Sequence, residues 1–153
     1  MKISDALNED ELSRLAARTV KVGDVYEITM TEANGIKPKP GDASRDKYFV
    51  VLGFDSEGVA YGGVIINTQI NKNLPGYIKM YHMPIKQSKY PFLRYDSFVD
   101  CVQLKRAYPQ KFDEWNYLGE IDEYDVELII GTIKESPRES AEYLAQYLSL
   151  IHI

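Results

Sequence analysis

The segment VIINTQINKNLPGY, from Val64 to Tyr77, changes character abruptly. A run of Val and Ile that is typical of a buried strand gives way to Asn67, Thr68 and Gln69, and then to a loop that carries Lys72. Amides, a hydroxyl and an ammonium group at the end of a core strand predict a polar site at the edge of a sheet. The simpler interpretation is an ordinary strand end, where Asn and Thr side chains cap the turn.

Two cationic residues, Arg45 and Lys47, stand just before another apolar strand. If the two strands pair antiparallel through a turn at Asp55–Gly58, Lys47 lies opposite Ile66 and Arg45 approaches Thr68. A bulge at the glycine pair inside the second strand would shift this register by about one residue. The sequence thus predicts that a cation meets a hydroxyl or amide across neighbouring strands, an arrangement that binds phosphate without metal or histidine.

Other chemistries have little support in the sequence. His82 and His152 are far apart and have no metal-ligand spacing, and His82 alternates with its neighbours as a surface or cross-strand residue. The single cysteine, Cys101, lies in an apolar strand, where a thiol is usually inert, and it excludes an internal disulfide. The carboxylates near Asp122 belong to a helix start rather than to a catalytic pair. We therefore expect no metal and no cofactor.

Charge is distributed unevenly along the chain. Between Ile36 and Arg94 nine basic and four acidic residues give a net charge of +5, although the whole chain carries −5. A local basic patch matters more to a polyanion than the total charge does. The plainer interpretation of these lysines is a solvated sheet surface.

Short strands and turns around these residues predict a mainly β domain with helices at both ends. The alternation of apolar residues predicts the strands Val25–Met30, Tyr48–Phe54, Val59–Gln69, Tyr77–Met83 and Phe98–Leu104, with a brief one at Trp115–Leu118. Their lengths favour a small antiparallel barrel. The segment Glu32–Asp46, rich in Gly and Pro, predicts a long loop between two of them.

Helices are predicted from their caps. Asn8 followed by Glu11 begins one helix, Asp122 begins a second that runs through Ile133, and Ser136-Pro137 begins a third. We divide the chain into an N-terminal helical extension (1–20), a barrel domain (21–136) and a C-terminal helix and tail (137–153). The apolar end, 148–153, is left out of the fold prediction. No segment is long and apolar enough to span a bilayer, and we expect a cytoplasmic protein.

Four ordered stretches carry a family resemblance, covering residues 21 to 137. They are VGDVY at 22–26, KYFVVL at 47–52, INTQI at 66–70 with the following Leu74-Pro75, and DSFVDCVQL at 96–104 with LGEI at 118–121. In this order they resemble the MazF/PemK/Kid toxins of type II toxin–antitoxin modules. The resemblance implies an SH3-like barrel and a metal-independent, sequence-specific endoribonuclease.

The resemblance also implies a mechanism. The RNA 2′-hydroxyl attacks the adjacent phosphate and leaves a 2′,3′-cyclic phosphate, an Arg assists proton transfer, and a Thr orients the phosphate. Here Lys47 occupies the Arg position, Tyr48 replaces the usual Pro, and the Thr position falls on either Asn67 or Thr68. Lysine lacks the bidentate fork of arginine, and Arg45 is a possible substitute. The candidate catalytic residues are therefore Arg45, Lys47, Asn67 and Thr68.

Further residues are predicted to contact RNA because they flank this site or offer an aromatic face. They are Lys37, Lys39, Tyr48, Gln69, Lys72, Lys89 and Tyr90. The resemblance implies a homodimer inhibited by an antitoxin. The alternative, favoured by the Lys47 and Asn67 departures, is a catalytically silent barrel that binds nucleic acid, a nucleotide or a protein partner in regulation or phage defence.

Overall fold

The structure is mainly β. A computed structural model describes residues 8–37, 39–55, 60–139 and 141–148. Its strands are β1 (Asp24–Met30), β2 (Arg45–Phe54), β3 (Tyr61–Asn67), β4 (His82–Ile85), β5 (Ser97–Ala107) and β6 (Asn116–Glu120). They form one antiparallel sheet in the order β4-β5-β3-β2-β1-β6. The predicted class, β with flanking helices, is confirmed.

The predicted closure into a barrel is wrong. Within the described residues, β4 pairs only with β5 and β6 pairs only with β1, so the sheet stays open. Both edge strands are short, and β4 contains Pro84, which has no N–H to donate to another strand. Short edge strands with proline limit further strand pairing.

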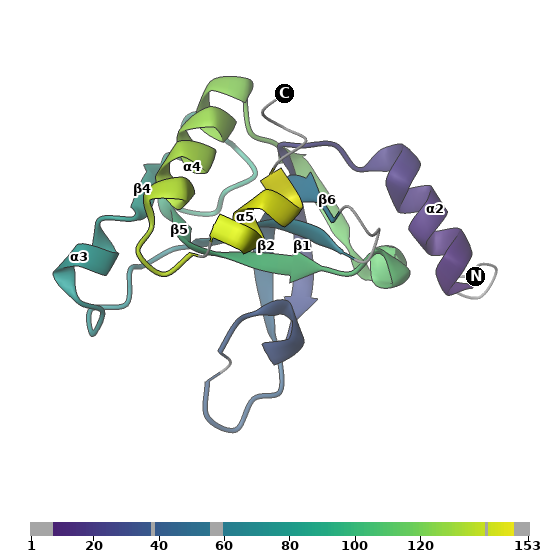
Figure 1. Ribbon diagram of the computed structural model, residues 1–153, viewed down its shortest axis with the longest axis horizontal. Coiled ribbons are helices and arrows are strands. Elements are labelled where there is room, and N and C mark those ends of the chain that lie inside the picture. Colours follow the sequence, from purple (N-terminus) through teal and green to yellow (C-terminus); the bar gives the residue numbers. More distant parts are fainter. Residues whose placement is uncertain (1–7, 38, 56–59, 140, 149–153) are drawn as a thin grey trace.

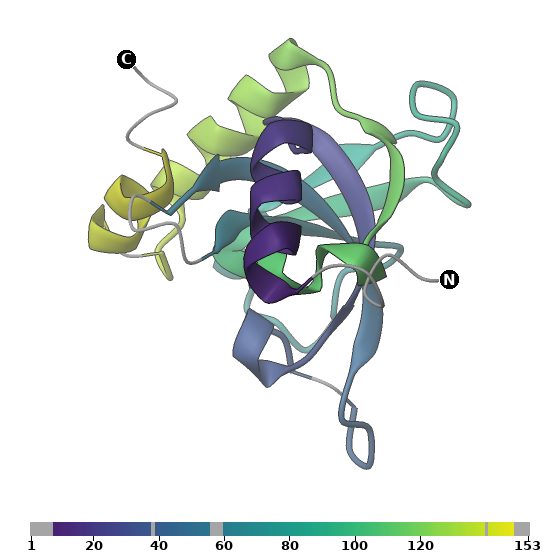
Figure 2. The same ribbon diagram turned by 90° about the vertical axis from the view of Figure 1, so that its right-hand side faces the viewer.

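Alternating side chains of the central strands build an apolar layer on each face of the sheet. On one face, Val50 and Val64 pack with residues of the helix α4 (Glu123–Glu135) and with Tyr147 of α5 (Ala141–Leu148). On the other, Phe49 packs with Ala16 of the helix α2 (Glu9–Thr19) and with Trp115. Figure 1 shows α4 and α5 together over one face of the sheet. Figure 2 shows α2, which packs on the other apolar layer, in front of the strands.

Two of the three predicted helix starts agree with the structure. Asn8 caps α2, where its side chain accepts a hydrogen bond from the Glu11 amide at 2.9 Å. Asp122 caps α4 and accepts one from the Asp125 amide at 2.8 Å. The four predicted core residues of α4 are all buried: Val126, Ile129, Ile130 and Ile133. The third helix, α5, begins at Ala141 rather than Pro137, because Ser136 instead ends α4.

The predicted strand at 77–83 is wrong for residues 77–81 and agrees with the structure only at its last two residues. Residues Gly76–Lys79 form one helical turn, α3, and β4 starts only at His82. The carbonyl of Pro75, just before this turn, accepts hydrogen bonds from the backbone N–H groups of Ile78 and Lys79. Ile78 is therefore buried by a helical turn and not by the alternation of a strand. Of the predicted turn at Asp55–Gly58 and the apolar end at 148–153, residues 56–58 and 149–153 lie outside the described residues.

The connection between β1 and β2 carries part of the candidate site. It starts with a 3₁₀ helix, Glu32–Asn34, and ends at Arg45, so Arg45 and Asp46 belong to a strand and not to the predicted loop. Figure 1 shows this connection extending away from the body of the molecule. Among the residues of the described ranges, no helix has the length and apolar character that crossing a bilayer requires.

Candidate functional site

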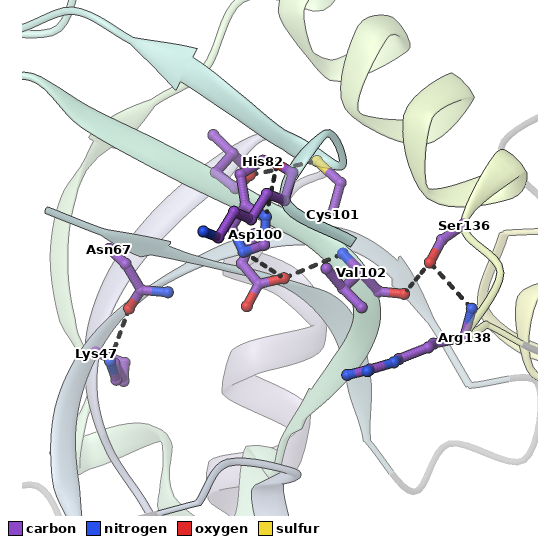
Figure 3. A network of polar contacts seen from close by, with 10 residues as sticks. Lys47, Asn67, His82, Asp100, Cys101, Val102, Ser136 and Arg138 are labelled. Atoms are coloured by element: carbon purple, nitrogen blue, oxygen red, sulfur yellow. Dashed lines mark hydrogen bonds and ion pairs between the residues drawn. The ribbon is translucent and has the colours of Figure 1, made fainter. Parts of the chain in front are cut away.

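The predicted meeting of a cation with the end of β3 is present. Lys47 Nζ donates a hydrogen bond to Asn67 Oδ1 at 2.7 Å across the neighbouring strands β2 and β3 (Figure 3). The observed register pairs Tyr48 with Ile66, so it is shifted by one residue from the predicted pairing. A β-bulge lies in β2 between Val51 and Gly53, opposite the glycine pair of β3. The cation that reaches β3 is therefore Lys47, opposite Asn67, while exposed Thr68 follows the strand.

Lys47 sits in an environment that disfavours its charge. Its side chain is half-buried, and burial is the main cause of a lowered pKa. The nearby charges of Arg45, Lys105 and Lys39 lower the pKa further, whereas Asp100 raises it. Such a group of like charges is unfavourable for folding alone and is characteristic of a site that binds an anion.

Asp100 and His82 are parts of the site that the sequence analysis missed. Asp100 lies on β5 opposite Ile65 of β3 and opposite His82 of β4, so all three side chains share one face of the sheet. His82 Nε2 is 3.8 Å from Asp100 Oδ1, and the backbone N–H of Val102 donates to the same oxygen at 3.0 Å (Figure 3). The predicted cross-strand position of His82 is confirmed, but His82 is buried rather than exposed.

A second lysine, Lys105, lies on the same strand as Asp100. Burial lowers its pKa, Asp100 and Glu139 raise it, and Lys37 lowers it. The 3₁₀ segment beside it is tied to β5, because Asn34 Nδ2 donates to the Arg106 carbonyl at 2.8 Å. Lys105 and Lys47 thus both respond to the charge of Asp100.

Several predicted RNA contacts lie near this group. Lys37 and Lys39 are exposed on the β1–β2 connection, and their charges act on Lys105 and Lys47 respectively. Gln69 and Lys72 are exposed in the segment that follows β3. Residues on both sides of the Lys47–Asn67 pair are therefore available to a ligand.

Other predicted contacts lie elsewhere. Tyr48 packs against the apolar layer on the opposite face of the sheet from Lys47. Lys89 makes ion pairs with Asp122 at 2.9 Å and Asp125 at 2.8 Å, and buried Tyr90 donates from its hydroxyl to Asp125 at 2.5 Å. Lys89 and Tyr90 line a groove of about 870 Å³ beside α4, which shares no lining residue with the Lys47 group.

Cys101 is a structural thiol, as predicted. It is completely buried, and burial raises its pKa to about 12. Among residues 8–37, 39–55, 60–139 and 141–148, no three His, Cys, Asp or Glu side chains are grouped so that they could hold a metal ion. No protein-family model matches the sequence, and a search of curated proteins finds no match.

Proposed function

We propose that this protein is an endoribonuclease toxin that acts without metal and cleaves RNA at the Lys47–Asn67 site. The observation that carries the proposal is the hydrogen bond of half-buried Lys47 to Asn67 within a group of cations beside the carboxylate of Asp100. The resemblance to the MazF/PemK/Kid toxins supplies the reaction. The proposal includes cleavage at a specific sequence.

The electrostatics of the group support a phosphate ligand. Lys47, Arg45 and Lys39 are all positively charged, and a phosphodiester would bring a negative charge that attracts each of them. Each charge-assisted hydrogen bond to the phosphate is also stronger than a neutral one. Binding would therefore relieve the repulsion that, after burial, contributes to the lowered pKa of Lys47. Asn67 fixes the ammonium group and has an amide of its own for a phosphate oxygen.

The reaction itself fits the same residues. Attack by a 2′-hydroxyl raises the negative charge on the phosphate, and the Lys47 ammonium and the Arg45 guanidinium would stabilise that charge. A lowered pKa also makes the Lys47 ammonium a better proton donor to the leaving 5′-oxygen. DNA lacks the 2′-hydroxyl and would bind without being cut.

A second candidate function is a silent module that binds nucleic acid. It is favoured by the engagement of the Lys47 ammonium with a protein amide, which satisfies one of its three donors before any ligand arrives. In that case RNA binds and stays intact. Binding and cleavage must therefore be measured separately.

Incubation of the purified protein with mixed-sequence RNA in EDTA tests the proposal. We expect cleavage by the wild-type chain and loss of cleavage in Lys47→Ala and Arg45→Ala. Asp46→Asn is the matched control, since Asp46 lies between these two residues and accepts a hydrogen bond from Thr29 Oγ1 that an Asn oxygen can also accept. RNA that remains intact but bound would replace the proposal with the silent module.

On the family resemblance, we also propose a cytoplasmic homodimer that an antitoxin inhibits. Growth arrest on induction, relieved by Lys47→Ala and by co-expression of a neighbouring small open reading frame, is the expected result. Analytical ultracentrifugation of the purified chain measures the oligomeric state directly. A monomer at all concentrations would contradict the dimer.

A further inference from the structure

We infer that Asp100 is the group that accepts the proton of the attacking 2′-hydroxyl, held in position by the Val102 amide and with the buried ring of His82 behind it. This inference rests on the proposed function, because it assigns a catalytic residue for that reaction. Neither the sequence motifs nor the resemblance gave Asp100 a role. Its place in the sheet does.

The strand register puts Asp100 beside the Lys47–Asn67 pair. Asn67 lies opposite Phe98 on β5, and Asp100 is two residues further along that strand, so Asn67 and Asp100 are diagonal neighbours on the same face. Diagonal neighbours in an antiparallel pair have Cα atoms about 7–8 Å apart, a span that one phosphodiester fills. The Asp100 side chain keeps 19% of its surface exposed, so a hydroxyl group can reach it.

One oxygen of Asp100 is held and the other is available. Oδ1 accepts from the Val102 N–H at 3.0 Å and faces His82 Nε2 at 3.8 Å, and no hydrogen bond to Oδ2 occurs within the described residues. His82 is in turn fixed by the contact of its Nδ1 with the Lys79 carbonyl at 3.2 Å. His82 is too buried to contact a substrate, with a side chain only 3% exposed, so it is a positioning residue.

Lysine side chains lie on both sides of Asp100 along the sheet. Lys47 reaches Asn67 on one side of Asp100, and Lys105 lies on the other, where the 3₁₀ segment is anchored to β5. Both lysines have lowered pKa values that Asp100 partly offsets. A phosphate bound between them would present its neighbouring 2′-hydroxyl to the carboxylate.

The chemical step is balanced in protons and bonds. Asp100 Oδ2 takes the proton of the 2′-hydroxyl as the O2′–P bond forms and the P–O5′ bond breaks. The departing O5′ takes a proton from the Lys47 ammonium, giving a 5′-hydroxyl and a 2′,3′-cyclic phosphate. Asp100 then returns its proton to water, and Lys47 recovers one from water.

Single-turnover cleavage by Asp100→Asn tests the inference. The change preserves shape and the acceptor for Val102, but removes the base, and we expect the rate to fall by at least about 100-fold, the usual contribution of a general base. The dissociation constant for RNA should stay the same or decrease, because one negative charge leaves a phosphate site. Asp46→Asn is again the matched control and should retain the wild-type rate.

A substrate with sulfur at the bridging 5′ position separates the two proton transfers. A thiolate leaves without protonation, so this substrate should restore cleavage by Lys47→Gln but not by Asp100→Asn. For His82→Gln we expect a lower maximal rate with unchanged RNA affinity, since His82 acts only through Asp100.

The outcomes keep the two proposals apart. Failure of the wild-type chain to cleave any RNA would overturn the proposed function itself. A wild-type chain that cleaves, together with Asp100→Asn that is folded and cleaves within about threefold of the wild-type rate, would overturn the role of Asp100 alone, because a general base contributes far more than that. Rescue of Asp100→Asn by the sulfur substrate would also overturn it.

Discussion

At the scale of single residues, the site is defined by charges placed where folding alone does not favour them. Lys47 and Lys105 are both partly buried, and both have a lowered pKa because burial and neighbouring cations disfavour the protonated form. Proteins keep such groups where a ligand or a reaction requires them. Asp100 is the carboxylate that both lysines share.

The pH dependence of stability should reveal the cost of the Lys47 charge. In the unfolded chain Lys47 titrates at its ordinary value of 10.5, and in the folded chain it titrates lower, so the unfolded state binds more protons between these two values. The free energy of unfolding of the wild-type chain should therefore increase relative to that of Lys47→Met as pH rises through the lowered pKa toward 10.5. Urea unfolding of both chains from pH 7 to 10.5 measures the difference, with exposed Lys134→Met as the control. A difference that is constant with pH would contradict the account.

Cys101 should be unreactive while the chain is folded. Its thiol is completely buried and its pKa is raised to about 12, so the thiolate is scarce at pH 8 and inaccessible. We expect labelling by a thiol reagent only at the rate of unfolding, and full labelling in denaturant. Rapid labelling of the native chain would show that β5 opens at this point.

At the scale of elements, strand contacts explain why the site is held in this form. The glycine pair of β3 allows β2 and α5 to approach the strand closely. A Cβ on Gly63 would lie 1.9 Å from the Val50 carbonyl oxygen of β2, and one on Gly62 would lie 2.5 Å from the Tyr147 ring of α5. The bulge beside this pair sets the register that brings Lys47 opposite Asn67. Local packing thus determines which cation reaches the site.

Alanine substitutions at two glycines should have opposite effects. Gly63→Ala must displace the backbone of β2, and we expect a loss of about 3 kcal/mol or more of unfolding free energy. Gly131→Ala lies in α4, where an added Cβ meets no atom within 4 Å, and should gain about 0.5–1 kcal/mol from helix propensity. Thermal and urea unfolding check both. A neutral Gly63→Ala would mean that β2 and β3 are not packed as described.

Much of the element pattern could be predicted from sequence, because caps and periodicity are local. The helices at Asn8 and Asp122, and most strands, follow from residues within one or two turns of each other. Barrel closure could not be predicted, since it depends on what the edge strands β4 and β6 meet in space.

The site was only half predictable for the same reason. Lys47 and Asn67 stood out because polar residues interrupt apolar strands. Asp100 did not stand out, because its role comes from the register with β3 and β4. Lys89 was predicted to contact RNA, although Asp122 and Asp125, more than thirty residues away, are its partners.

At the scale of the whole molecule, an acidic chain presents a local basic site. The net charge of −5 coexists with a group of cations that comes from β2, β5 and the β1–β2 connection. The acidic rim of the α4 groove, with Glu120, Glu123 and Glu127, is separate from it. A polyanion should therefore bind at this group of cations rather than at the groove beside α4.

The salt dependence of RNA binding should distinguish the two regions. Each lysine that contacts a phosphate adds about 0.7 to the slope of the logarithm of affinity against the logarithm of salt concentration for a single strand. Lys47→Gln and Lys39→Gln should each reduce the slope by about this amount. Lys89→Gln should leave it unchanged, because Lys89 is paired with Asp122 and Asp125. Equal reductions by all three would show a diffuse surface interaction.

The chemistry of the RNA ends tests the central claim most directly. The wild-type chain is incubated in EDTA with an RNA and with a DNA of the same sequence, and the new ends are identified by mass spectrometry. The account predicts that only RNA is cut, giving 2′,3′-cyclic phosphate and 5′-hydroxyl ends, and that Lys47→Gln abolishes both products. Intact RNA, or cleavage that leaves a 3′-hydroxyl and a 5′-phosphate, would contradict it.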